Sequence, residues 1–161
     1  MALTAAQMAL VKAHITASGD MNTLPNTSDG AFAIAALFNL PASPSFTVWK
    51  NIETLANIGK AFNATELAGM STLNNTRLQT LAQYLTDGVN PSIASNRQFF
   101  DDVFSGAGGV NTRAALLILW KRLATRVEKV LATGTGSDAS PATMGFVGAI
   151  SYQDVEAARN S

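Results

Sequence analysis

Side chains that could do chemistry are few in this sequence, and their spacing matches no catalytic or metal-binding pattern. His14 is the only histidine, and neither position four residues away from it holds His, Asp or Glu, so a helix would bring it no second metal ligand. No nucleophile elbow accompanies it, and the chain has no cysteine. We therefore expect no catalytic, cofactor-binding or metal-binding residues, and interpret His14 as a surface or partly buried side chain.

The glycine-rich and acidic segments lead to the same expectation. The run Gly106-Ala-Gly-Gly lacks the lysine and the spacing of a phosphate-binding loop, and Thr133-Gly-Thr-Gly-Ser lacks the third glycine of a dinucleotide fingerprint. Both are typical of hinges or mobile loops. Asp101 and Asp102 are adjacent on a predicted helix, where neighbouring side chains point in different directions, so a solvated face is the simpler interpretation.

Basic residues form the one remaining pattern that could serve a chemical or binding role. Arg122, Arg126 and Lys129 recur at intervals of four and three residues, and on a helix they would stack along one side. Three interpretations stay open. The side can be a solvent-facing surface near a helix C-terminus, where cations are favourable. It can instead pair with acidic groups of a neighbouring subunit, or lie along a phosphate backbone. No base-reading motif is visible.

These residues depend on one predicted element, which spans Asn111–Leu131. It is the longest helical pattern in the chain, and its apolar side chains recur at the spacing of a core-facing helix. The sequence therefore predicts a central helix over residues 111–131. Expected helix N-caps are Thr4 with Gln7, Ser28 or Asp29, Ser71, Ser92 or Ser95, Asn111, and Ser151 with Asp154.

The expected fold class is mainly α, a small helical bundle around the helix at 111–131. A short two-stranded β ribbon is predicted to pair residues 46–50 with 144–150. A further helix is predicted over residues 72–86. We expect one domain, residues 1–161, with a flexible Gly/Ser-rich loop at 133–141 and a C-terminal arm at 142–161.

Composition narrows the function classes further. Hydrophobic residues make up 47% of the chain, its formal net charge is zero, and charged residues are only 14%, against about 25% in an average protein. Such a surface has little electrostatic repulsion between copies, which suits a packed oligomer and equally a monomer with a Ser/Thr-rich surface. The start of the chain does not resemble a signal peptide, and the longest apolar run is far too short to span a bilayer. We expect an intracellular protein with no membrane segment.

Several patches resemble a family of small virion proteins of tailed bacteriophages, encoded among head and neck genes. The C-terminal patches are Val127-Glu-Lys-Val-Leu-Ala-Thr-Gly-Thr-Gly, Ser140-Pro-Ala-Thr-Met, Ile150-Ser-Tyr-Gln-Asp-Val and the closing Ala-Ala-Arg-Asn. Two patches near the start, Asp29-Gly-Ala-Phe-Ala-Ile-Ala and Ala42-Ser-Pro-Ser-Phe-Thr-Val-Trp-Lys, are similar to the family's "DGAIAIA" and "PASPAFTVWR". Residues 51–92 are matched less clearly. These motifs are structural, not catalytic.

The resemblance implies a head-to-tail adaptor, or another neck or minor head protein. Such adaptors form a ring, commonly of twelve copies, below the portal, and genome DNA passes through the centre. The implied partners are copies of the chain itself, the portal protein, other neck or tail proteins, and DNA without sequence-specific contacts. The implied location is the virion neck after synthesis in the host cytoplasm. We hypothesise that the arm from Met144 to Ser161, with Phe146, Ile150 and Tyr152, contacts another subunit.

Overall fold

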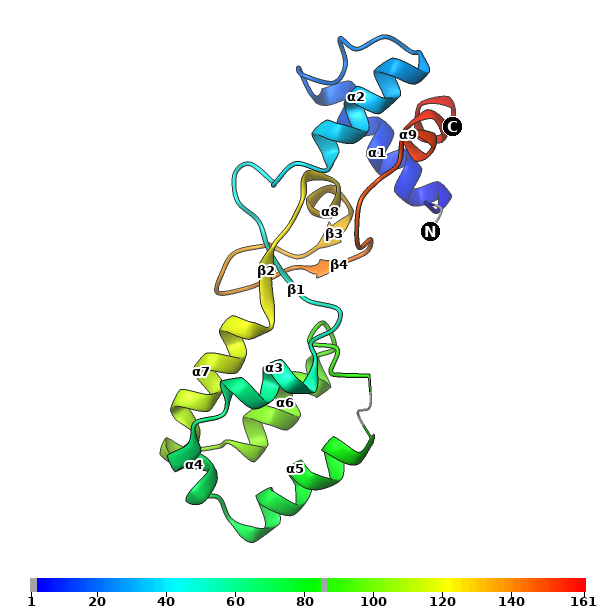
Figure 1. Ribbon diagram of the computed structural model, residues 1–161. Coiled ribbons are helices and arrows are strands. Elements are labelled where there is room, and N and C mark those ends of the chain that lie inside the picture. The colour runs from blue at the N-terminus through cyan, green and yellow to red at the C-terminus, as the bar shows by residue number, and fades with distance from the viewer. Residues whose placement is uncertain (1–2, 85–86) are drawn as a thin grey trace. The chain divides into compact units, whose positions relative to one another are not determined.

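The computed structural model describes residues 3–84 and 87–161, and it is mainly α-helical with short strands, which confirms the predicted fold class (Figure 1). The chain divides into two compact units. The terminal unit comprises Met1–Val48 and Leu123–Ser161, and the middle unit comprises Trp49–Arg122. Each unit has an apolar cluster of its own. The sequence predicts one domain and does not indicate this division, because nothing in the composition marks the two positions, 48/49 and 122/123, at which the chain passes from one unit to the other.

The described residues of the terminal unit form four helices: α1 (Ala5–Ala17), α2 (Ser28–Phe38), α8 (Arg126–Leu131) and α9 (Tyr152–Asn160). Helix α1 begins at the predicted capping box, in which the Thr4 side chain accepts from the Gln7 N–H and the Gln7 side chain accepts from the Thr4 N–H. The Ser151–Asp154 box starts α9 in the same way. Helix α2 is capped by Thr27, one residue before the predicted Ser28.

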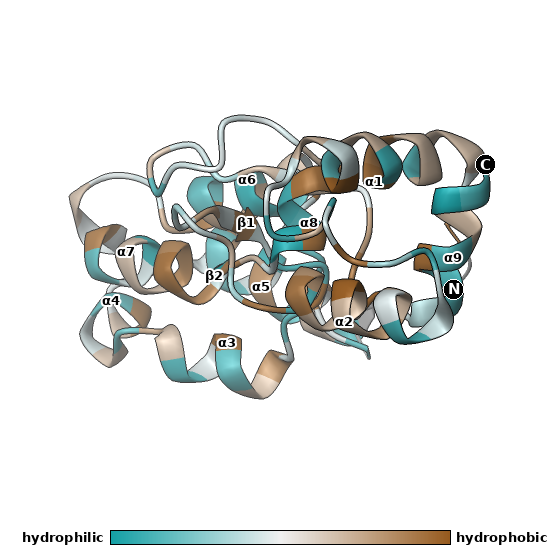
Figure 2. Ribbon diagram, turned by 90° about the horizontal axis from the view of Figure 1, so that it is seen from above, coloured by the Kyte–Doolittle hydropathy of each residue, from teal (hydrophilic) through white to brown (hydrophobic). Residues whose placement is uncertain are grey.

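The C-terminal segment packs within the terminal unit. Helix α9 lies against α1 and α2 (Figure 1). Two buried residues of α9, Val155 and Ala158, join Phe146 and Ile150 in the same apolar cluster as Val11, Ile34 and Phe38. Helix α2 carries hydrophobic residues along much of its ribbon (Figure 2), and its buried Ala31, Ile34, Ala35 and Phe38 belong to that cluster. The predicted arm at 142–161 therefore supplies part of the core of its own chain.

The segment predicted as a flexible loop is joined to the rest of the terminal unit. Strand β3 (Ala132–Thr133) pairs antiparallel with β4 (Thr143–Met144). Between them, Gly136 adopts φ +66° and its carbonyl accepts a 2.7 Å hydrogen bond from the Thr47 N–H. A β-carbon at Gly136 would collide with the Phe46 ring, so this close approach requires glycine.

The predicted partner of the 46–50 strand is wrong. Strand β1 (Thr47–Trp49) pairs with β2 (Lys121–Leu123), and only an isolated parallel bridge joins Val48 to Ala142. The reason lies in the backbone of 145–150. Its N–H groups at Gly148 and Ile150 donate to the side chains of Glu128 and Asn39, and Asn39 also donates to the Ile150 carbonyl. These side chains satisfy the groups that a strand would pair.

The predicted helix over 111–131 is also wrong, because the structure divides it into α7 (Val110–Leu119), β2 and α8. Thr125 opens α8 with a capping box of its own, formed with Glu128. Just before it, the Ala124 N–H donates to the Phe46 carbonyl, and the Trp120 carbonyl accepts from the Lys50 N–H. In a continuous helix the backbone groups of Trp120 and Ala124 would pair within the helix. Because the helix ends at Trp120 and a new one starts after Thr125, these groups pair with residues 46 and 50 instead.

The middle unit contains α3 (Leu55–Ala61), α4 (Ala64–Ala68), α5 (Thr72–Tyr84), α6 (Ala94–Val103), a 3₁₀ turn (Ala107–Gly109) and α7. As predicted, the Ser71 hydroxyl accepts from the Asn74 N–H at the start of α5. The predicted continuation of that helix through 85–86 lies outside the described residues. Helix α6 follows Ile93 without a side-chain cap, so the predicted serine cap is wrong. Helix α7 begins after Gly109, two residues before the predicted cap at Asn111.

The core of the middle unit is aromatic. Phe100 is buried with its ring edge-on to Trp120, at 5.4 Å between ring centroids, and edge-on to Phe99 at 5.5 Å. A pair of hydrogen bonds between the backbones of Glu53 and Val89 closes one side of this core. The remaining buried members of the cluster are Ile58, Val103, Phe104 and Leu116.

Candidate functional site

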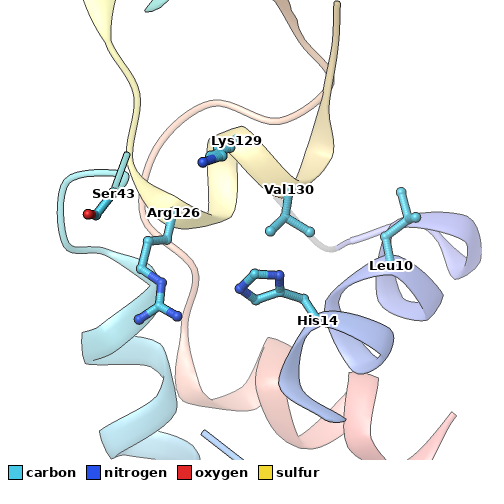
Figure 3. A pocket seen from close by; sticks show the side chains of 6 residues that line it. All are labelled: Leu10, His14, Ser43, Arg126, Lys129 and Val130. Carbon is cyan, nitrogen blue, oxygen red and sulfur yellow. The ribbon is translucent and has the colours of Figure 1, made fainter. Parts of the chain in front are cut away.

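A basic hollow in the terminal unit gathers polar side chains from both ends of the chain. Its volume is about 400 Å³, and its lining comprises Leu10 and His14 of α1, Ser43 between α2 and β1, and Arg126, Lys129 and Val130 of α8. Figure 3 shows His14 extending from α1 into the space beside Arg126 and Val130, with Lys129 on the next turn of α8. A hollow of this size accommodates a small polar ligand.

Arg126 is held in place by an ion pair with Asp20. Its Nη1 donates to Asp20 Oδ2 at 2.6 Å, and its Nη2 donates to Asp20 Oδ1 at 3.2 Å and to Ser18 Oγ at 3.0 Å. The hydrogen bonds from Arg126 and from Ser18 hold the pKa of Asp20 well below its usual range. Asp20 therefore stays ionised and fixes the guanidinium at the edge of the hollow.

Lys129 contacts a backbone carbonyl and an aromatic ring. Its Nζ donates to the Pro44 carbonyl at 3.3 Å and lies 5.7 Å from the centroid of the Phe46 ring. Within the described part of the chain no carboxylate pairs with this ammonium group. An ammonium group has three N–H donors, so it keeps donors for a further acceptor.

His14 lies between these charges. Its Nε2 is buried and has no hydrogen-bond partner among the described residues, and its ring packs 5.6 Å from that of Phe38. Burial is the main cause that lowers the pKa of His14 from 6.5, and the charges of Arg126 and Lys129 lower it further. The carboxylate of Asp20 opposes this shift. His14 is therefore neutral at neutral pH.

The structure brings together two of the three residues of the predicted basic side. Arg126 and Lys129 share α8, whereas Arg122 lies in β2, so the three do not form one helical face. His14 joins Arg126 and Lys129 across more than a hundred residues of sequence, and no local pattern could have indicated this. The Thr125-x-x-Glu128 box is the signal that would have placed the start of α8 correctly.

The predicted contact residues of the C-terminal arm have different surroundings. Phe146 and Ile150 are 8% and 2% exposed and pack in the core of the terminal unit. Tyr152 is half-buried, and its ring stacks on that of Phe32 with 3.9 Å between centroids. Contacts within the chain thus involve all three side chains that the sequence hypothesis assigns to a neighbouring subunit, and they bury two of them, Phe146 and Ile150.

The outer face of α7 in the middle unit is apolar and exposed. Val110 is 50% exposed, Leu117 46% and Ile118 73%. Exposed Ala114 continues the row between Val110 and Ile118, because residues four apart share a helix face. Figure 2 shows that hydrophobic positions occupy much of α7.

Beside this face lies a second hollow, of about 460 Å³, within the middle unit. The Arg97 guanidinium stacks 4.0 Å from the centre of the Trp49 ring at its edge, and Val110, Ala114 and Leu117 form one wall. Arg113 also lines it and donates to the carbonyls of Phe104 and Gly106. An apolar row with a polar hollow alongside resembles the core and rim of a protein–protein interface.

Two further kinds of feature are absent from residues 3–84 and 87–161. No three His, Cys, Asp or Glu side chains lie close enough together to hold a metal ion. None of the helices described has both the length and the apolar character needed to cross a membrane. Comparisons with protein-family models, with curated proteins and with solved structures found no match for this chain.

Proposed function

We propose that this chain is a structural virion protein of a tailed bacteriophage, a head-to-tail adaptor that assembles as a ring below the portal. The observation that carries the proposal is the exposed apolar row on α7, with Val110, Ala114, Leu117 and Ile118 on one face. Burying such a face stabilises an assembly by about 25 cal/mol for each Å² of apolar surface removed from water. The resemblance of the terminal patches to neck proteins supports the same function.

A second copy of the chain is the occupant we assign to the α7 face. The chain has a formal net charge of zero, so identical subunits can pack closely without strong repulsion. In a ring, one surface of each subunit meets a different surface of the next, and rotation closes the circle. The α7 row would then meet another surface of the neighbouring copy, with the Arg97–Trp49 hollow at the interface rim.

The test measures assembly of the full chain, alone and with the purified portal protein of the same phage. Sedimentation and negative-stain microscopy should show rings with portal. The variant Ile118→Asp should weaken association about tenfold or more, because a carboxylate replaces a side chain that becomes desolvated in the interface. Since Ile118 is 73% exposed, its replacement should leave the circular dichroism and the melting temperature nearly unchanged.

Leu73→Asp is the matched control. Leu73 lies on α5, also in the middle unit, and is 61% exposed, so the same change of charge is made on a different surface. It should assemble as the wild type does. A wild-type chain that stays monomeric in the presence of portal would overturn the proposal, and so would equal losses of assembly in the two variants.

A further inference from the structure

We propose that the basic hollow of the terminal unit binds a phosphate group, with His14 and Lys129 as hydrogen-bond donors and Arg126 as a fixed neighbouring charge. The two donors come from different helices, α1 and α8, and line the same hollow. Leu10 and Val130 supply the apolar part of its wall (Figure 3). Few but convergent polar groups on a partly apolar wall are typical of a small-ligand site.

Donor capacity supports this assignment. His14 Nε2 is buried without a partner among the described residues, which is costly unless a ligand or a water satisfies it. Lys129 donates to one carbonyl and has N–H groups left over. Arg126 directs both terminal nitrogens at Asp20 and Ser18, so it contributes positive charge to the hollow more than hydrogen bonds.

The charges select the kind of ligand. Asp20 balances Arg126, whereas Lys129 has no carboxylate partner in the described part of the chain. A protonated His14 would add a second uncompensated positive charge beside Lys129. A dianionic phosphate would neutralise both, whereas a carboxylate would neutralise one. The groups facing His14 are Arg126, Lys129 and Asp20, and a bound dianion would outweigh the two cations that disfavour its protonation.

The test uses His14 as its own reporter. Because it is the only histidine, its ring signals in an NMR spectrum of the full chain are unambiguous. Inorganic phosphate, added against sodium chloride at matched ionic strength, should shift these signals saturably and raise the pKa of His14. Acetate at the same concentration should produce a smaller shift.

Two lysine variants distinguish phosphate binding in the hollow from a general electrostatic attraction of phosphate to the chain. Lys129→Gln should weaken phosphate binding about tenfold or more, as expected for the loss of a charge-assisted hydrogen bond. The control, Lys12→Gln, makes the same change of charge on α1, where Lys12 donates to the Ser161 carbonyl and lines a different hollow. It should bind phosphate within about twofold of wild type, since exposed charges outside the hollow are screened.

Two results would overturn the inference: no saturable response of His14 to phosphate, or equal weakening by the two lysine variants. A short single-stranded oligonucleotide forms the second arm of the experiment. If it shifts the His14 signals and competes with phosphate, the phosphate belongs to a nucleic-acid backbone; if it does neither while phosphate binds, the ligand is a free phosphate or phosphate monoester. The hollow lies in the terminal unit and the α7 face in the middle unit, so each proposal can fail without the other.

Discussion

The carboxylate of Glu128 accepts a 3.2 Å hydrogen bond from the backbone N–H of Gly148, twenty residues later in the chain. Its other oxygen accepts from the Thr125 N–H at 3.0 Å, which completes the capping box of α8. Glu128 is only 1% exposed. One buried side chain therefore both starts a helix and holds the segment that leads to α9.

Replacing this carboxylate should destabilise the terminal unit. Glu128→Ala leaves the N–H groups of Thr125 and Gly148, whose hydrogen bonds to Glu128 are partly buried, without their acceptor, and we expect a loss of about 2 kcal/mol in the free energy of unfolding. Glu128→Gln should lose less, because its amide oxygen can still accept one bond. Urea denaturation followed by circular dichroism measures both. The control is Glu156→Ala, which removes one exposed hydrogen bond from Ser28; an equal loss there would contradict the role of Glu128.

A core substitution should affect the middle unit selectively. Phe100 is 2% exposed and packs against Trp120, so Phe100→Ala should cost about 3–5 kcal/mol in the free energy of unfolding. Both tryptophans of the chain, Trp49 and Trp120, belong to the middle unit, so tryptophan fluorescence reports its unfolding. The half-buried Phe99 provides the control, and Phe99→Ala should lower the midpoint of the unfolding transition, followed by tryptophan fluorescence, less than Phe100→Ala does. Equal midpoints for the two variants would exclude Phe100 as the centre of this core.

The start of α7 depends on a carboxylate from α4. Glu66 accepts from the backbone N–H groups of Asn111 and Thr112, both at 2.8 Å, where Gly109 provides no side-chain cap. The interaction with Thr112, followed by those with Asn111, lowers the pKa of Glu66 below 4.5. Its contribution to stability is therefore present above pH 4.5 and lost as the pH falls through that value toward the lower pKa of the folded chain.

The corresponding prediction compares Glu66→Gln with wild type across that pH range. The variant should be less stable at pH 7, and its stability should fall less than that of wild type between pH 5 and pH 3, with tryptophan fluorescence as the probe. Other carboxylates titrate in both proteins and cancel in the difference. Parallel pH curves for the two proteins would show that Glu66 does not hold the first turn of α7.

Local signals in the sequence were sufficient for some elements and misleading for others. The boxes at Thr4–Gln7 and Ser151–Asp154 involve residues three apart, and both were predicted correctly. The prediction of one helix over 111–131 was wrong because the apolar spacing continues through a segment whose backbone pairs with residues 42–50. Pairing with residues so distant in sequence does not alter the local hydrophobic periodicity. The same limit explains why the sequence did not indicate the hollow around His14, because Arg126 and Lys129 come close to it only through the packing of α1 on α8.

A chain ending at Leu131 should fail to fold its terminal unit. It would lack Phe146, Ile150, Val155 and Ala158, all of which lie in the same buried cluster as Val11 and Phe38. We expect the NMR ring signals of His14 to move to the chemical shifts of an unfolded chain, while the tryptophan fluorescence of the middle unit stays closer to that of the full chain. Retention of a native-like His14 environment in the shortened chain would show that residues 142–161 are an independent arm, as the sequence hypothesis states.

His14 should make the terminal unit less stable in mild acid. Its folded pKa is below 6.5, mainly because burial penalises the charged ring, so the unfolded chain takes up a proton more readily than the folded one. Stability should therefore be highest above pH 6.5 and decline as the pH falls from 6.5 toward the folded pKa. Carboxylates with ordinary pKa values near 4 do not titrate in this range. Thermal unfolding between pH 7.5 and pH 5.5, in buffers without phosphate, measures the effect.

Two variants test whether His14 is the source of this decline. His14→Gln cannot be protonated and should show a flatter curve between pH 7.5 and pH 5.5. Asp20→Asn removes the carboxylate that raises the pKa of His14, so the NMR titration of the ring should move to lower pH, and the loss of stability should extend further into acid. Asp29→Asn makes the same change of charge at an exposed position on α2 and should leave the titration unchanged. If His14→Gln retains the full decline, the titrating group is elsewhere in the chain, and the neutral buried imidazole assigned to the hollow is wrong.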